Sequence, residues 1–427
     1  TIKINGAITA QSGDTKINVQ RNVTIQGTNK ATDKLDAANR TYIFHIWSGH
    51  KLTLKKLTLQ GGKNTDAYRG GGAIYCTGGK LTTEDVIIQN CNAKNGGAIY
   101  AKDSSEITLK NTQIKSCEAT GTGTGEGRGG AIYCKESTLT LDNTTIGGSA
   151  STDGNKARRG GGIYFEGETN ECSIPSGCTI QYNKVTGDSG ATSGGGGVYI
   201  QSGKLTLGGT ISDNSALLNF DALASGGGVF VGAKGTFIME AGATISGNQA
   251  AGGAGAGGGV YVDSGEFTMK GGEIKNNNAQ NGGGVYINAN QSEAKEGSFM
   301  MEGSATVTLS KGGDVNLPGK NDVYLNNDGN YRASIIVTGT LTGTPAARLT
   351  MKYIESGAGS GYYPERDVVK GYHNGESVVY QLKSTDVSKF KVTPEPTTWQ
   401  HPGVTWNWRL EHSDSGSGEG IGKLTYP

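Results

Sequence analysis

One short pattern, repeated along the chain, sets the strongest limit on how this sequence can fold. Two to four glycines run into a β-branched residue that is followed at once by an aromatic ring, as in GGGAIY and NGGGVYI. Repetition at intervals of 25 to 35 residues indicates a stack of equivalent units rather than independent globular domains. The aromatic residues of the eight copies are Tyr75, Tyr100, Tyr133, Tyr164, Tyr199, Phe230, Tyr261 and Tyr286.

The shortest copies show what one unit contains. Residues 71–95 hold three short β-rich runs, AIYC, KLTT and VIIQN, separated by Gly, Asp and Asn turn signals. Ankyrin and tetratricopeptide units need amphipathic helices, which the sequence lacks, and a propeller blade needs four strands in about 40 residues. We therefore predict an all-β fold, a right-handed single-stranded parallel β-helix with three strands per coil. Its in-register strands are expected to lie about 4.8 Å apart.

The strand after the glycines alternates with a period of two. The neighbours of Tyr199 are Val198 and Ile200, and every copy after it repeats this apolar flanking. A period of two places the flanking residues inward and the aromatic ring outward. We expect the glycines to form the tight corner before the strand, with positive φ and close passage of neighbouring coils.

The third strand of each unit ends in its own signature, Ile-x-x-Asn-x-Ala. It occurs at Asn214, Asn248 and Asn277, with a variant at Asn183. An asparagine at the same corner of successive coils predicts a stacked amide ladder that satisfies backbone groups of the turn.

These two motifs resemble a known family. Gly-Gly-Ala-Ile combined with apolar-x-x-Asn is similar to the repeats of bacterial polymorphic outer-membrane proteins and related autotransported β-helices, over roughly residues 60–290. The resemblance implies an adhesin at the outer-membrane surface or outside the cell. The family's usual Phe before x-x-Asn is Ile in this chain, and no C-terminal membrane-barrel segment is evident. We expect membrane attachment to come from segments outside this chain.

The pattern changes toward both ends of the chain. We assign residues 1–344 to the β-helix, with N-terminal rungs and a cap in 1–60, glycine repeats in 61–290 and degenerate rungs in 291–344. Three of the four tryptophans lie beyond residue 360, where composition shifts. Residues 345–427 are predicted to form a β-rich cap over the end of the core.

The chain contains six cysteines, and the positions of four of them suggest disulfide bonds. Cys91 and Cys117 occupy the asparagine position on consecutive coils, within disulfide range of each other, and Cys172 and Cys178 bracket the short loop SIPSG. We predict disulfides 91–117 and 172–178 and two buried thiols, which would favour an exported protein. The alternative is that all six cysteines only fill space in the core.

Composition and motifs argue against several functional classes. The net charge is +1, so the chain as a whole is not a nucleic-acid binder. The five histidines have no zinc spacing. Of the polygalacturonase-like signatures Asn-Thr-Asp, Gly-His-Gly and Arg-Ile-Lys, only an isolated Asn-Thr-Asp occurs, at residues 64–66. We predict no catalytic residues, no metal and no cofactor.

Expanded segments mark where a partner is expected to bind. They lie before the glycine corners, at 63–69, 120–128, 151–159, 186–193, 217–225 and 251–256, and stacking brings them to one edge. The ring ladder runs beside this edge and suits glycans or extended peptide, unless the loops cover it. The candidate ligand-binding residues are Arg128, Arg158, Arg159, Leu218, Phe220, Tyr133, Tyr164, Tyr199, Phe230 and Tyr261.

The sequence hypothesis is therefore a non-enzymatic bacterial surface adhesin. Its expected partner is a host-cell surface or extracellular-matrix protein, or a glycan, and not a nucleic acid. Two alternatives stay open: a carbohydrate-active β-helix enzyme, either lyase or hydrolase, and a structural surface-coat protein.

Overall fold

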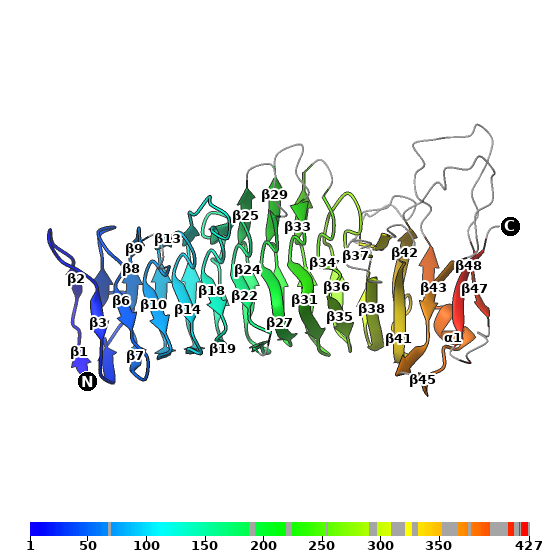
Figure 1. Ribbon diagram of the computed structural model, residues 1–427, viewed down its shortest axis with the longest axis horizontal. Coiled ribbons are helices and arrows are strands. Elements are labelled where there is room, and N and C mark those ends of the chain that lie inside the picture. The colour runs from blue at the N-terminus through cyan, green and yellow to red at the C-terminus, as the bar shows by residue number, and fades with distance from the viewer. Residues whose placement is uncertain are drawn as a thin grey trace.

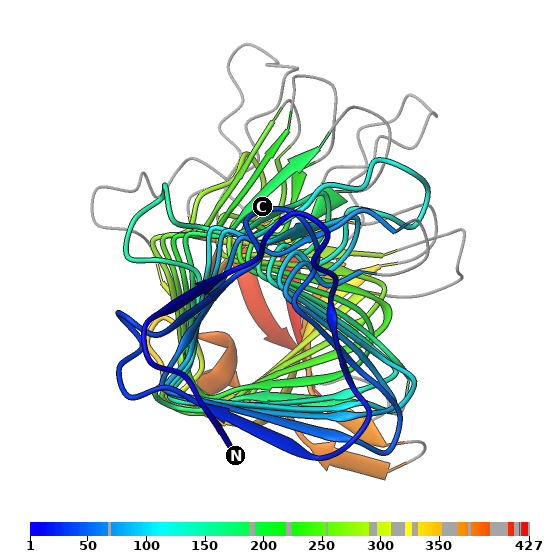
Figure 2. The ribbon, with the colours of Figure 1, turned by 90° about the vertical axis from the view of Figure 1, so that its left-hand side faces the viewer.

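The chain forms one long right-handed β-solenoid, seen from the side in Figure 1 and along its axis in Figure 2. The computed structural model describes all residues except 67–69, 169, 188–192, 219–223, 253–254, 290–296, 309–320, 327–331, 352–365, 375–376, 393–408, 414–417, 419 and 426–427. The predicted all-β parallel β-helix is confirmed. Nearly every pairing between coils is parallel.

Three faces make up each coil. The first face carries the aromatic strands: β3 (Ile17–Val19), β6 (Phe44–Ile46), β10 (Ile74–Thr77), β14 (Ile99–Lys102), β18 (Ile132–Lys135), β22 (Ile163–Glu166), the first halves of β27 (Val198–Leu207) and β31 (Val229–Met239), β34 (Val260–Asp263), β37 (Val285–Asn288), β40 (Val323–Asn326), β42 (Ala347–Met351) and β46 (Phe390–Val392).

The second face follows directly. It contains β1 (Ile2–Lys3), β4 (Val23–Gln26), β7 (Lys51–Lys55), β11 (Lys80–Glu84), β15 (Glu106–Lys110), β19 (Thr138–Asp142), β23 (Glu171–Ile174), the second halves of β27 and β31, β35 (Glu266–Met269), β38 (Gly297–Gly303), β41 (Ala333–Leu341) and β43 (Arg366–Lys370).

The third face is made of shorter strands. They are β2 (Ala7–Thr9), β5 (Lys34–Asp36), β8 (Thr58–Gln60), β12 (Ile87–Gln89), β16 (Gln113–Lys115), β20 (Thr145–Ile146), β24 (Thr179–Gln181), β28 (Thr210–Ser212), β32 (Thr244–Ser246), β36 (Glu273–Lys275) and β39 (Thr306–Val307).

A fourth ladder, which the sequence did not predict, follows the asparagine corner. Its strands are β9 (Lys63–Asn64), β13 (Asn92–Ala93), β17 (Glu118–Ala119), β21 (Lys156–Ala157), β25 (Lys184–Gly187), β29 (Ser215–Leu218) and β33 (Gln249–Ala251). Two short strands, β26 (Ser193–Gly194) and β30 (Ala224–Ser225), pair beside it.

The register between coils follows the aromatic residues. Tyr75 pairs with Tyr100, Tyr100 with Tyr133, and the series continues without a break to Tyr286 and Tyr324. Their apolar neighbours point inward into one continuous core that runs along the solenoid. A one-residue slip would turn this apolar set outward, so burial fixes the register.

The glycine corners have the predicted geometry. Gly129 has a φ of 66°, and one glycine of each other corner also lies in the left-handed region. At Gly130 an added Cβ would lie 2.1 Å from the carbonyl oxygen of Gly161 in the next coil. Both the backbone angle and the close passage of coils therefore require glycine.

The predicted asparagine ladder is present and fully buried. Each amide NH2 donates to the Oδ1 of the next asparagine at 2.8–3.0 Å and to a backbone carbonyl of the preceding coil. Each Oδ1 also accepts a backbone N–H bond from the coil before it. The ladder consists of Asn155, Asn183, Asn214, Asn248 and Asn277, and it satisfies turn groups that water cannot reach.

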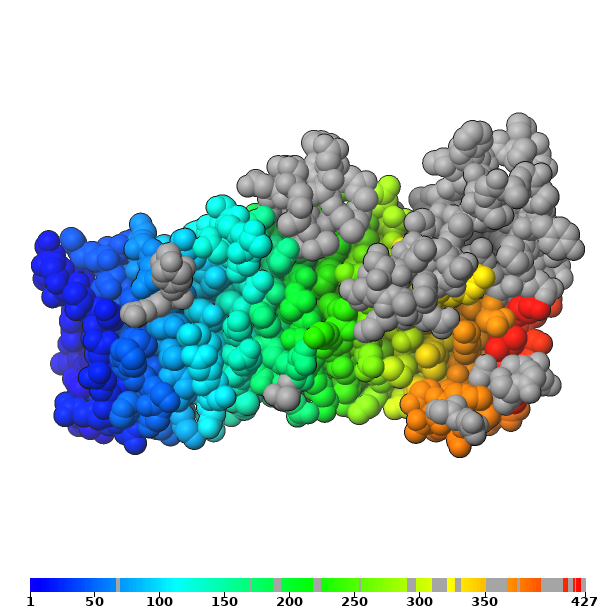
Figure 3. Space-filling model, viewed as in Figure 1, coloured from blue at the N-terminus to red at the C-terminus, as the bar shows by residue number. Residues whose placement is uncertain are grey.

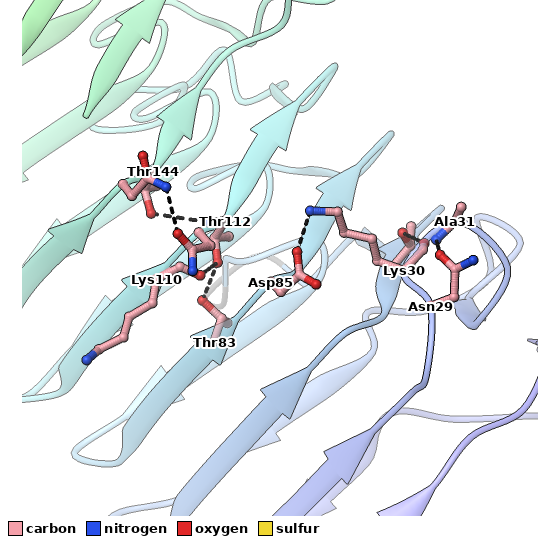
Figure 4. Close-up of polar contacts among 11 residues, drawn as sticks. Asn29, Lys30, Ala31, Thr83, Asp85, Lys110, Thr112 and Thr144 are labelled. Carbon is pink, nitrogen blue, oxygen red and sulfur yellow. Dashed lines mark hydrogen bonds and ion pairs between the residues drawn. The ribbon is translucent and has the colours of Figure 1, made fainter. Parts of the chain in front are cut away.

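A second polar run lies at the corner between the second and third faces (Figure 4). The hydroxyls of Thr83 and Thr112 are 2.8 Å apart, and Thr144 accepts a bond from the backbone N–H of Thr112. These threonines are buried, so each coil corner is tied to the next by side chains as well as by the β-ladder.

Parallel pairing continues past residue 344, because β42 pairs with β40 and β46 with β42. The direction changes only at the C-terminal end, where β43 and β47 (Arg409–Ser413) pair antiparallel with β48 (Ile421–Thr425). The hairpin of β44 (Tyr372–Asn374) and β45 (Ser377–Tyr380) and the single turn α1 (Ser384–Val387) complete this end.

Candidate functional site: the inserted edge

The aromatic ladder is buried, which corrects its prediction as a ligand-binding surface. Five of its residues, Tyr133, Tyr164, Tyr199, Phe230 and Tyr261, form a cluster of their own, and each is 5% exposed or less. The rings point away from the main core, as the alternation predicted, and successive ring centroids are 4.3–5.3 Å apart. The ladder is thus a second hydrophobic core outside the first.

A row of backbone covers the rings. The residue just before each glycine corner bridges to the equivalent residue one coil on, through Arg128, Arg159, Gly194, Ser225, Ala256 and Asn281. The row runs close against the rings, because a Cβ added at Gly194 would lie 3.0 Å from Cδ2 of Phe230. The last residues of the incoming loops therefore lie against the ladder, in line with the alternative considered from the sequence.

Arg128 is part of this cover and not a free binding group. One of its terminal nitrogens donates to the Tyr133 hydroxyl at 2.9 Å and to Oε2 of Glu166 at 3.0 Å. The Tyr133 hydroxyl in turn donates to the same Glu166 oxygen at 2.6 Å. The guanidinium also lies over the Tyr164 ring, 5.0 Å from its centroid. These contacts join consecutive coils across the ladder.

The electrostatics of this cluster are structural rather than catalytic. Burial, reinforced by the Glu166 carboxylate, raises the pKa of Tyr133 far above its ordinary value. Burial likewise raises the pKa of Tyr164, and it raises the pKa of Tyr199 to about 12. Burial lowers the pKa of Arg128, but the nearby Tyr164, Tyr133 and Glu166 outweigh it and the net pKa is raised. The phenols stay protonated near neutral pH and the arginine stays charged, so the hydrogen bonds and the ion pair to Glu166 persist there.

The other two candidate arginines are half-buried and partly engaged. The Arg158 guanidinium donates to the carbonyl oxygens of Thr122 and Gly123 in the preceding coil's insertion, at 2.5 and 3.5 Å. Arg159 bridges through its backbone to Arg128 and Gly194. Both arginines hold neighbouring insertions together.

The 151–159 insertion is also placed differently from its prediction. Asn155 is the ladder asparagine of this coil, so most of the extra chain precedes the corner instead of following it. The sequence does mark Asn155 as the ladder asparagine, because Asn155-Lys156-Ala157 keeps the Asn-x-Ala half of the motif. The other half is displaced, because Ile146 lies further before the asparagine than in the other copies.

Beyond this cover, the fourth ladder projects from the body of the solenoid. Strands β25, β29 and β33 rise above the faces in Figure 1. We call the surface of these three strands the projecting edge. Its inner side chains pack in a small separate cluster of Val185, Ala216, Ala224, Ala250 and Ala279.

The outer side chains of the projecting edge form a row in register. Leu217 pairs with Thr186 on one side and Ala251 on the other, and its side chain is 41% exposed. The row before it contains Lys184, Ser215 and Gln249. Leu217 therefore offers an apolar contact point on a strand that the solenoid holds in place. Leu218 lies in β29 but its side chain, like all of Phe220, falls outside the described residues.

The predicted disulfides are absent. All six cysteines are free and buried. Although Cys91 and Cys117 stack at the ladder corner, each thiol donates instead to a carbonyl oxygen two residues earlier, of Gln89 and Lys115, at 3.2 Å. Cys172 points into the core from β23, in register with Leu139 and Leu205. The cysteines therefore give no support to the prediction of an exported protein.

No metal centre and no membrane-spanning helix emerge from the described part of the chain. No group of three or more His, Cys, Asp and Glu side chains in it is placed to hold a metal ion. No helix in it is long and apolar enough to cross a membrane.

Comparison with known proteins gives no relative. No family model matches the chain, and neither a curated protein nor a solved structure is significantly similar to it.

Proposed function

We propose that this protein is a non-enzymatic bacterial surface adhesin that binds its partner with the projecting edge. The observation that carries the proposal is the row of exposed Thr186 and Leu217 and half-buried Ala251, held in register on strands that extend beyond the solenoid body. Loops and short strands on a rigid scaffold are where binding surfaces are usually built.

The proposal differs from the sequence hypothesis in the residues that meet the partner. The aromatic ladder and Arg128 stabilise the edge, and the outer face of β25, β29 and β33 makes the contact. The space-filling view shows one long body (Figure 3). A long, regular scaffold with one elaborated side suits a host-cell or matrix protein better than a small buried substrate.

Location at the bacterial surface rests on the resemblance of the repeats to polymorphic outer-membrane proteins. Gly-Gly-Ala-Ile and apolar-x-x-Asn serve the glycine corner and the asparagine corner in this chain, so the two motifs that carry the resemblance are structural. They support a shared architecture, and the adhesive role is our proposal.

The test is retention on immobilised matrix proteins, host-cell membranes and acidic polysaccharides, with Leu217→Asp as the variant. The matched control is Val379→Asp, because Val379 is also an exposed apolar strand residue, 55% exposed, at the C-terminal end. Saturable retention that falls at least tenfold in Leu217→Asp and not in Val379→Asp supports the proposal.

Equal retention of both variants would refute the projecting edge as the binding surface. Retention on polysaccharide alone, with steady loss of polymer from the surface, would instead establish the enzyme alternative.

A further inference from the structure

The N-terminal coils carry a charge imbalance that the net charge of the chain hides. Residues 1–60 contain nine Lys and Arg, three Asp and no Glu, a formal charge of +6. Because the whole chain carries +1, the remaining residues carry −5. A positive end on a negative body attracts anionic ligands to that end.

Two of these nine cations are neutralised by later coils. Lys30 pairs with Asp85 at 2.5 Å (Figure 4), and Lys55 with Glu84 at 2.6 Å. Within the described residues, Arg21 and Lys51 have no such ion pair, and both are exposed. They flank the corner between the first and second faces of the first two coils.

This corner also carries an exposed tryptophan. Trp47 follows β6 and is 40% exposed, whereas the ring ladder it borders is covered further along the solenoid. Its indole packs at a tilt against His45 with centroids 4.2 Å apart, and His45 packs at a tilt against Tyr75 at 4.8 Å. Its Nε1–H is 3.4 Å from Oδ1 of Asn18. These contacts fix the ring before any ligand arrives, which lowers the entropy cost of binding.

Backbone hydrogen bonds hold the turns that carry Arg21, Trp47 and Lys51 side by side. The Trp47 backbone N–H donates to the carbonyl of Val19, and the Lys51 backbone N–H donates to Oδ1 of Asn22 at 2.9 Å. Residues 20–22 and 47–51 therefore form two adjacent turns. Since its Oδ1 is taken, Asn22 presents its exposed amide NH2 as a donor.

We propose that this corner binds an acidic oligosaccharide. One sugar ring stacks on Trp47, its carboxylate or sulfate group meets Arg21 and Lys51, and the amide of Asn22 donates to a hydroxyl. The combination of one amphipathic ring, amides and two cations suits a sugar that carries both hydroxyls and negative charge.

Other polyanions fit this corner less well. Binding of single-stranded nucleic acid uses several aromatic rings on which successive bases stack, and a membrane surface needs a broader apolar face. At this corner Trp47 is the exposed ring, and Arg21, Asn22 and Lys51 are exposed in the same two turns.

The test uses titration calorimetry and tryptophan fluorescence on the full chain. The probes are a sulfated heparin tetrasaccharide and tetragalacturonate, with neutral maltotetraose, a short oligothymidine and phosphatidylserine vesicles as comparisons. The variants are Trp47→Ala, Trp47→Phe and the pair Arg21→Gln with Lys51→Gln. The matched charge control is Lys110→Gln with Lys156→Gln, two exposed lysines on later coils.

The expected result is binding of at least one acidic tetrasaccharide and not of maltotetraose. The Trp47→Ala variant and the Arg21/Lys51 double variant should each bind the acidic tetrasaccharide about tenfold more weakly. Trp47→Phe should retain most of this affinity, and the control pair should leave the affinity unchanged. The fluorescence change should vanish in Trp47→Phe.

The proposal is overturned if Trp47→Ala binds like the wild type, or if the control pair weakens binding as much as the corner pair. Equal or tighter binding of oligothymidine or vesicles would also overturn it, by assigning the corner to another polyanion. Leu217→Asp is not expected to affect this site, so its outcome is separate from that of the proposed adhesin function.

Discussion

The hydroxyl of Tyr133 donates a 2.6 Å hydrogen bond to the carboxylate of Glu166, 33 residues later and one coil further along the solenoid. Arg128, from the loop that enters the Tyr133 coil, donates to both groups. This triad fastens the cover of the aromatic ladder to the ladder itself, so its removal tests whether the cover is a structural element.

Glu166→Ala should destabilise these coils by about 2 kcal/mol, because it leaves a half-buried arginine and a phenol without their acceptor. The measurement is the free energy of local opening from amide hydrogen exchange in β18 and β22. Glu171→Ala is the control, since Glu171 also pairs with a cation, Lys204, but its side chain is 71% exposed. That change should cost under about 0.5 kcal/mol. Similar effects of both variants would contradict the role of the triad.

Replacing a ring of the ladder should affect stability more than binding. Tyr164 has 0% exposure, and Tyr164→Ala should cost about 3–5 kcal/mol because it opens a cavity between stacked rings. Tyr164→Phe keeps the ring and loses only the hydrogen bond to Gln201, at a cost of about 1 kcal/mol. If Tyr164→Phe abolished partner binding with its unfolding profile unchanged, the ladder would be a recognition surface after all.

The asparagine ladder should be sensitive to removal of any one member. Oδ1 of Asn248 accepts from the backbone N–H and the side-chain amide of Asn214, and its own NH2 donates to the carbonyl of Ile211. Asn248→Ala leaves all three groups buried without these partners and should cost roughly 3 kcal/mol or more. Gln249→Ala changes the next residue, which is exposed on β33, and should be nearly neutral. Denaturant unfolding of the two variants decides the point.

All six thiols should be free and shielded. Burial raises the pKa of Cys76 to about 11 and of Cys172 to about 12, so little thiolate forms near neutral pH. We expect almost no alkylation of the folded protein by iodoacetamide and six alkylations after denaturation without reductant. A sample reduced before denaturation gives the reference mass. Two or four missing alkyl groups would restore one or both predicted disulfides.

The fold was predictable because two short-range signals repeat. The period of two around Tyr199 and the glycine corner before it recur through residues 61–290, and in-register stacking follows from their spacing. The different lengths of the coils did not obscure this repeat, because the inserted residues lie at the corners and leave the strands unchanged.

The candidate site was harder to predict because its contacts leave little trace in sequence. The cover over the rings is backbone at Gly194, which has no side chain to signal a contact. Arg128 and Glu166 are 38 residues apart and meet only because the coils between them stack. The disulfide prediction used the spacing of coils, whereas the outcome depends on where each thiol points. Trp47 lay outside the glycine repeats, and the net charge of +1 concealed the basic N-terminal end.

Acid should weaken the N-terminal coils through Asp33. Its buried carboxylate accepts backbone N–H bonds from Gly6, Thr28 and Asn29 at 2.6–3.1 Å. These bonds hold the pKa of Asp33 well below its usual range. Because the folded pKa lies below the unfolded value of about 3.9, the stabilisation is complete above that pH and is lost as pH falls further toward the folded pKa.

Asp33→Asn should therefore lower the thermal midpoint at pH 7, and its difference from the wild type should shrink as the pH drops below about 4. Asp142→Asn, at an exposed position on β19, provides the control and should track the wild type at every pH. The measurement is thermal unfolding followed by circular dichroism, with hydrogen exchange in β4 and β5 to localise the change. If the difference in thermal midpoint between Asp33→Asn and the wild type stayed constant across the acid range, Asp33 would stabilise the corner by packing. A contribution from its charge must disappear when the wild-type carboxylate is protonated.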